Sequence, residues 1–188
     1  VLEGLPRARN GGQTLTITLA DDFSSVTVKL NYTVWDDSNV IARNLEIVNG
    51  EQLPVNIEKA FGFAMDLPAG GYKTLCLAGR WAQERIPQIE DIGHGIRRFQ
   101  SLRGISSHEM TPFVGILKPD ATENSGECYG VQLVYSGSFA ITTEHFDNKP
   151  LRVQGGICDV GFNWKLDGGK SFVTPQTLLC YSACGIGG

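Results

Sequence analysis

Hydrophobic and polar residues alternate most clearly over residues 25–35. In an extended chain, a period of two residues places the apolar side chains on one face and the polar ones on the other. The pattern therefore predicts a β-strand with one buried face. The residues predicted to share that face are Val26, Val28, Leu30, Tyr32 and Val34.

Similar segments recur along the chain, separated by clusters of turn-forming residues at about the 8–12-residue spacing of β-sandwiches. No segment keeps a helical period over a full helix length. We therefore expect an all-β fold, a large antiparallel β-sandwich of two sheets. The further predicted strands are residues 40–48, 55–65, 113–117, 129–135, 139–144, 151–157, 171–173 and 177–181.

Composition agrees with this fold class. The chain has 188 residues, 23 of them glycine, and only 19% are charged. Such values suit a turn-rich β protein better than a helical one. The length is sufficient for one sizeable core, so we expect residues 1–188 to form a single domain.

Charge and cysteine usage limit the classes of partner. The net charge is −4, and no basic stripe is present to bind a phosphate backbone, so we expect no nucleic-acid partner. The apolar runs are too short to cross a bilayer, so we expect no membrane partner. The five cysteines include no Cys-x-x-Cys pair, which predicts no metal site or cofactor and favours a reducing, cytoplasmic location. Cys76, Cys128 and Cys180 are predicted to be small buried side chains.

Two clusters that combine aromatic and charged residues interrupt the strand pattern. The first is 79–85, which contains Trp81 and Arg85, and the second is 103–108, which ends at His108. Trp, Arg and His are side chains that stack on sugar rings or pair with carboxylates. We therefore take Trp81, Arg85 and His108 as the candidate substrate-binding or rim residues.

Each candidate also has a structural interpretation. Trp81 is either a core residue or an exposed stacking face, and its polar neighbours favour exposure. Arg85 either bonds Glu84 or pairs with a carboxylate across an interface. His108 follows two serines, but no nucleophile-elbow motif is present, so a hydrogen-bonded loop is the favoured interpretation.

Three segments together resemble glycoside hydrolase family 36, the family of bacterial and fungal α-galactosidases. Residues 77–85 resemble its Leu-x-Gly-x-Trp-x-x-Glu-Arg segment. Residues 106–113 resemble Ser-Ser-His-x-x-x-Pro-Phe, and residues 129–137 resemble its Tyr-Gly-x-x-Leu-Val-Tyr-Ser-Gly strand. The resemblance covers nearly the whole chain and concerns the N-terminal β-domain, a galactose-mutarotase-like supersandwich. It implies that the first strands precede Val1 and that the catalytic (β/α)8 barrel and a C-terminal domain lie outside this chain.

The resemblance implies a parent enzyme that hydrolyses terminal α-galactosides of the melibiose and raffinose type with retention. Retaining glycosidases need two facing carboxyl groups, and the family's catalytic aspartates lie in barrel motifs that do not occur here. The acidic doublets Asp21–Asp22 and Asp36–Asp37 fall in predicted turns. We therefore expect no catalytic residue in this chain, and a domain that supports the barrel, a tetrameric assembly and the rim of the active site.

Three alternatives stay open. In the first, the chain is a carbohydrate-binding module, with Trp35, Trp81 or Trp164 as its exposed platform. In the second, it is the same domain of a galactosyltransferase of the raffinose-synthase kind. A sugar epimerase would need an internal set of histidine and glutamate residues. The residues available for such a set are His94, His108, His145, Glu84 and Glu109.

Overall fold

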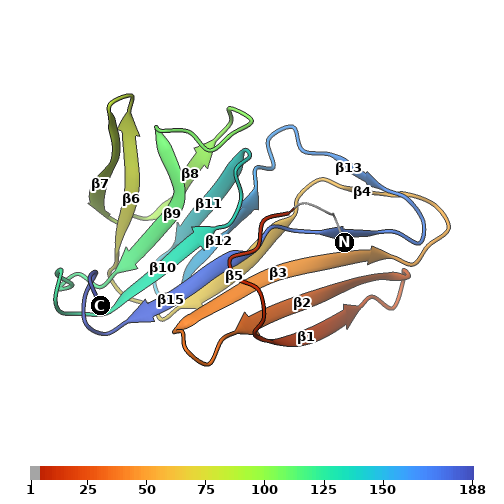
Figure 1. Cartoon of the computed structure of the whole chain (residues 1–188), viewed down its shortest axis with the longest axis horizontal. Coiled ribbons are helices and arrows are strands. Elements are labelled where there is room, and N and C mark those ends of the chain that lie inside the picture. Colours follow the sequence, from red (N-terminus) through yellow and green to blue (C-terminus); the bar gives the residue numbers. More distant parts are fainter. Residues whose placement is uncertain (1–4) are drawn as a thin grey trace.

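The computed structural model describes residues 5–188, and over that range the chain forms fifteen strands and no helix. Those residues accordingly include no helix that is long and apolar enough to cross a membrane. Residues 1–4, Val1 among them, lie outside the described residues. Figure 1 shows the strands arranged around one long curved sheet that runs from β1 to β7.

The larger sheet has nine strands, and every pair in it is antiparallel. Eight strands follow the order β1-β2-β3-β15-β10-β9-β6-β7, and β14 pairs with the end of β3. The bounds are β1 (Gln13–Ala20), β2 (Val26–Val34), β3 (Val40–Asn49), β6 (Lys73–Arg80), β7 (Gln83–Asp91), β9 (Met110–Leu117), β10 (Cys128–Leu133), β14 (Ser171–Val173) and β15 (Thr177–Ser182).

A second, four-stranded sheet has the order β5-β12-β11-β8, and a two-stranded sheet joins β13 to β4. All their pairs are antiparallel as well, which confirms the predicted fold class. The bounds are β4 (Val55–Ile57), β5 (Phe61–Leu67), β8 (Gly95–Ser101), β11 (Phe139–His145), β12 (Leu151–Ile157) and β13 (Trp164–Leu166).

The main core lies between the four-stranded sheet and one end of the larger sheet. Phe63, Phe99 and Phe139 from the smaller sheet pack with Val114 and Val131 of β9 and β10, and all five are at most 1% exposed. Burial of large apolar side chains is the main favourable term in folding. The core therefore holds the two sheets together at the end formed by β6, β9 and β10.

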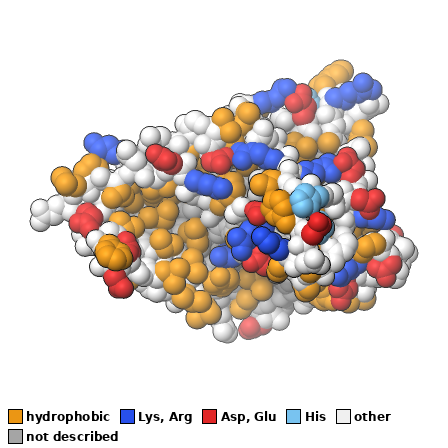
Figure 2. Space-filling model, turned by 180° about the vertical axis from the view of Figure 1, so that it is seen from behind, with side chains coloured by type: hydrophobic (Ala, Val, Ile, Leu, Met, Phe, Trp, Pro, Cys, Tyr) orange, Lys and Arg blue, Asp and Glu red, His pale blue; other side chains and the backbone are white. Residues whose placement is uncertain are grey.

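The other end of the larger sheet carries an apolar face that the described residues leave exposed over β1 and partly exposed over β2. Leu15, Ile17 and Leu19 of β1 are 62%, 42% and 51% exposed. They lie opposite Tyr32, Leu30 and Val28 of β2 on the same face. Figure 2, the view from behind, shows hydrophobic side chains gathered where β1–β3 lie once Figure 1 is turned. We call this surface the β1–β3 apolar face.

The strand predictions were right for most strands with one buried face, but they missed β1, β6, β7, β8 and β13, although Cys76 of β6 and Phe99 of β8 lie in the core. The predicted strand 55–65 is two strands, because β4 pairs with β13 while β5 pairs with β12 in another sheet. β7 was missed because it is an edge strand exposed along its whole length, so burial imposes no period on it. β1 was also missed, although its alternating Thr and apolar residues carry the period-two signal.

Candidate functional site

The first polar-aromatic cluster forms the turn of the β6–β7 hairpin, with Trp81 and Ala82 between the strands. The register shifts between Ala78 and Arg80, so β7 carries a bulge next to the turn. Gly79 is needed there, because a Cβ atom would lie 2.2 Å from the carbonyl oxygen of Gln83. Ala82 and Arg85 adopt left-handed backbone angles, with φ of 63° and 57°.

This geometry exposes Trp81 and leaves it 83% accessible, so it is not a core residue. The turn is held by its own polar groups. The Nε of Arg80 donates to Oε1 of Gln83 at 2.7 Å, and the amide of Ala82 donates to Oε1 of Glu84 at 2.9 Å. Glu84 therefore bonds the turn backbone, and no bond between Glu84 and Arg85 forms among the described residues.

The second cluster forms the loop between β8 and β9. The amide of Ser106 donates to the carbonyl of Ser136 at 2.6 Å, and its hydroxyl donates to the carbonyl of Tyr135 at 3.1 Å. Ser107 Oγ accepts from the amide of Glu109. His108 is exposed and bonds neither serine, so the arrangement matches the hydrogen-bonded loop and not a nucleophile with its base.

The two clusters meet at a shallow hollow of about 430 Å³. Arg85 lines it, while Trp81 and His108 do not. A bond from the amide of Gly79 to the carbonyl of Glu109 also ties the hairpin to the loop. All three segments that suggested the family resemblance contribute to the lining, which consists of Leu77, Arg85, Ser106, Thr111, Pro112, Gln132, Leu133, Tyr135 and Ser136.

Tyr135, Gln132 and Ser136 also line this hollow, and none of them was predicted as a site residue. They lie at and just beyond the end of β10, beside the serine loop to which Tyr135 and Ser136 are bonded. The sequence feature that could have identified them is the third family-like segment, residues 129–137, which was interpreted only as a strand. The pairing of β10 with β9, of β9 with β6 and of β6 with β7 brings them beside Arg85. No spacing in the sequence predicts these pairings.

Arg97, Arg98 and Arg103, which lie between and beside the two clusters, form ion pairs. Arg97 pairs with Glu90, and Arg103 pairs with Glu109 at 2.6 Å. Arg98 pairs with Asp159, where both side chains are less than one-third exposed. The hydrogen bond from the Arg98 guanidinium holds the pKa of Asp159 below its ordinary value. These three guanidinium groups therefore face carboxylates and do not form a shared anion site.

The tryptophans do not form a common platform. Trp35 is only 8% exposed, and its Nε1 donates to the carbonyl of Gly11, which contradicts its prediction as an exposed stacking residue. Trp164 packs against Phe172 with ring centroids 5.3 Å apart. Trp81 lies alone on the tip of its hairpin, so this arrangement does not favour the binding-module interpretation.

The cysteines are free thiols, and Cys180 is exposed, contrary to its predicted burial. It lies on β15 and faces away from the core, opposite Gly130. Within residues 5–188, no three His, Cys, Asp or Glu side chains gather as metal ligands. Asp21 accepts bonds from the amide of Phe23 and the hydroxyl of Ser24, as expected of a turn aspartate.

Comparisons with known proteins agree with this arrangement. The family model described as the glycosyl hydrolase family 36 N-terminal domain matches residues 1–167. α-Galactosidase 1 of Pediococcus pentosaceus is 39% identical over 98% of this chain, and the match spans 26% of that protein. The crystal structure of the α-galactosidase AgaA of Geobacillus stearothermophilus in complex with stachyose superposes with a TM-score of 0.94. It is 33% identical, over 98% of this chain and 26% of that one.

The galactosidase domain of the α-galactosidase–sucrose kinase AgaSK gives a TM-score of 0.93 at 36% identity, over 98% of this chain and 26% of that one. The chain thus spans about a quarter of the length of the relatives it matches. Fold, sequence and the three converging segments agree with the family model. This chain belongs to glycoside hydrolase family 36 and corresponds to the N-terminal domain of that family.

Proposed function

We propose that the protein containing this domain is an α-galactosidase that hydrolyses terminal α-galactosides of the melibiose and raffinose type with retention. The observation that carries the proposal is a match over nearly the whole chain to α-galactosidases that are about four times longer. The domain itself is non-catalytic in this proposal. Among the candidate acids, Asp37 is paired with Arg9, and Glu84 bonds the hairpin backbone.

The domain's proposed role includes the rim of the active site. The β6–β7 hairpin projects from the end of the larger sheet (Figure 1) and carries the exposed indole of Trp81. An exposed aromatic face on a well-ordered turn stacks on a sugar ring at little entropic cost. Arg85, in the adjacent hollow, pairs with a carboxylate of a facing domain or subunit in this proposal.

The domain also supports the catalytic barrel and a homotetramer in this proposal. The outer face of β6, β9 and β10 carries an apolar groove of about 580 Å³, lined by Leu75, Phe113 and Leu117. Gly115 and Gly130 add no side chains to it. Apolar grooves of this kind mark protein–protein contacts. Because all five cysteines are free, the proposed location is the cytoplasm.

The test is hydrolysis of p-nitrophenyl α-galactoside by the full-length protein and by residues 1–188 alone. We expect an active full-length protein and an inactive fragment. Trp81→Ala should lower kcat/KM by about tenfold, the loss of one stacking contact. Leu53→Ala, at an exposed apolar residue away from the hairpin, is the matched control.

Two results would contradict the proposal. Hydrolysis by residues 1–188 alone would place the catalytic carboxylates inside this domain. A full-length protein without α-galactosidase activity would refute the proposed function itself. Equal activity in Trp81→Ala and Leu53→Ala would refute only the rim role. Light scattering of the full-length protein checks the tetramer.

A further inference from the structure

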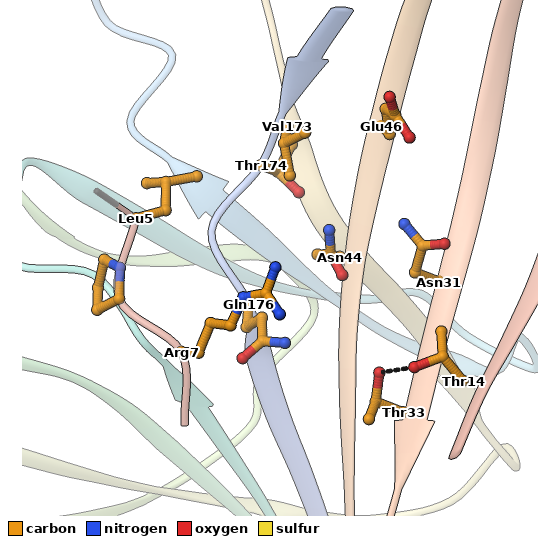
Figure 3. A pocket seen from close by; sticks show the side chains of 11 residues that line it. Leu5, Arg7, Thr14, Asn31, Thr33, Asn44, Glu46, Val173, Thr174 and Gln176 are labelled. Atoms are coloured by element: carbon orange, nitrogen blue, oxygen red, sulfur yellow. Dashed lines mark hydrogen bonds between the residues drawn. The ribbon is translucent and has the colours of Figure 1, made fainter. Parts of the chain in front are cut away.

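A polar groove of about 220 Å³ lies on the outer face of the larger sheet, at the opposite end from the hollow. Thr14, Asn31 and Asn44 come from β1, β2 and β3 and form its floor (Figure 3). They alternate with the residues of the β1–β3 apolar face and therefore point to the other side of the sheet. Gln176 and Arg7 stand across the groove.

The floor offers both donors and acceptors. Asn31 Oδ1 accepts from Thr16 at 2.8 Å, which leaves its NH₂ group directed to the ligand space. Glu46 Oε2 accepts from the Nζ of Lys29 at 3.2 Å, which leaves Oε1 of Glu46 as an acceptor for a ligand. The side-chain amide of Asn44 forms no hydrogen bond with a described residue. Its NH₂ donor and its carbonyl acceptor are therefore both available to a ligand.

The opposite wall adds donors. Gln176 Oε1 accepts from the backbone amide of Ala8 at 3.0 Å. This bond fixes the orientation of the Gln176 side chain, and its NH₂ group is available to donate to a ligand. Arg7 forms no hydrogen bond or ion pair with the part of the chain that the structure describes. A bond of 2.8 Å between the hydroxyls of Thr14 and Thr33 holds two floor strands in register. The groove is therefore largely preorganised.

Charge in the groove selects the class of ligand. The carboxylate of Glu46 opposes an anion, and the guanidinium of Arg7 opposes a cation. Amide groups donate and accept, the carboxylate accepts and the guanidinium donates. Together they complement a ligand whose hydroxyl groups both donate and accept hydrogen bonds. The volume admits one small ring. No residue of the groove is a thiol, imidazole or activated hydroxyl, so the chemistry is that of binding.

We propose that this groove binds one ring of a neutral sugar, separately from any hydrolytic site. Asn44 and Gln176 supply the main contacts, and Asn31 and Glu46 complete them. The lining contains no aromatic face. Affinity therefore rests on hydrogen bonds alone, and Kd is on the order of 1 mM. The proposal does not depend on the hydrolase activity proposed above.

The test is equilibrium dialysis of the full-length protein with labelled galactose, glucose and sucrose, none of which is an α-galactoside substrate. Asn44→Ala and Gln176→Ala should each weaken one binding event by about tenfold and leave p-nitrophenyl α-galactoside hydrolysis unchanged. Thr18→Ala, on the same face of β1 but outside the groove, is the control. Melting curves verify that each variant is folded.

The outcomes separate the two proposals. If the hydrolase proposal is right, Asn44→Ala keeps one galactose site of unchanged affinity, which belongs to catalysis, beside a groove site that is about tenfold weaker. If it is wrong, Asn44→Ala shows only the weakened groove site, and the groove proposal still holds. Equal binding of all three sugars by wild type, Asn44→Ala and Gln176→Ala overturns the groove proposal.

Discussion

At the scale of single residues, the structure explains several identities by contacts that the sequence alone does not show. Gly79 has no side chain because a carbonyl of the neighbouring strand occupies that space. Trp35 is tolerated at a buried position because its indole N–H donates to the carbonyl of Gly11. Asp159 is ionised beside Arg98, 61 residues away. Each of these roles is open to a stability measurement on the purified protein.

Gly79→Ala should lower the free energy of unfolding by about 2 kcal/mol, because the new Cβ would lie 2.2 Å from the carbonyl oxygen of Gln83. Gly93→Ala is the matched control, since a Cβ there meets nothing within 4 Å. Thermal or urea unfolding of both variants measures the difference. Equal stabilities would mean that the hairpin turn rearranges freely.

Asp159→Asn should destabilise the protein by about 1 kcal/mol at pH 7. Arg98 lowers the native pKa of Asp159, so the carboxylate contributes stability above its unfolded pKa of about 3.9. That contribution is lost as pH falls through the lower native pKa. Urea unfolding from pH 7 to pH 3 should therefore show the wild-type advantage shrinking only at the acid end.

The control for this pair is Asp37→Asn, which breaks the solvent-exposed pair with Arg9. Surface pairs contribute little, so its effect should be clearly smaller. A pH-independent difference for Asp159→Asn would show that packing, and not ionisation, is the source of the effect.

At the scale of elements, most strands with one buried face follow the alternation of the sequence, while the exposed edge strand β7 does not. β2 and β3 were predicted nearly to their ends because apolar side chains mark one face of each. β7 has no such mark, and its place is set by pairing with β6 through the hairpin turn. That turn contains an alanine in a conformation that glycine adopts at lower cost.

Ala82→Gly should raise the free energy of unfolding by about 0.5 kcal/mol. It removes the steric cost of the left-handed φ of 63°, partly offset by the greater freedom of glycine in the unfolded chain. Ala78→Gly, within β6 and outside the positive-φ positions, should instead destabilise by roughly 0.5–1 kcal/mol. Differential scanning calorimetry compares the two. A destabilised Ala82→Gly would show that the Ala82 methyl group makes a contact that matters more than its backbone angle.

At the scale of the whole molecule, the larger sheet extends beyond the smaller one. The four-stranded sheet packs mainly over β6, β9 and β10, and the β1 part of the β1–β3 apolar face is exposed among the described residues. Contiguous exposed apolar surface of this kind drives association. A protein made of these 188 residues should therefore self-associate.

Replacing Leu15 and Ile17 together by Lys should reduce that association, because both side chains lie on the β1–β3 apolar face. Thr18→Lys, on the opposite face of β1, adds charge without changing the apolar surface and should have little effect. Light scattering and binding of a hydrophobic dye measure the outcome. Equal loss of association in both variants would attribute the effect to net charge.

The sequence by itself determined the all-β class, most strands with one buried face, and the family, because alternation and short motifs are local properties of the chain. Trp81, Arg85 and His108 were selected from such motifs. Only the tertiary structure separated them: Arg85 lines the hollow, Trp81 projects from the hairpin tip, and His108 lies exposed on the neighbouring loop. Strand pairing and register decide which distant residues share a surface, and no short stretch of sequence encodes that choice.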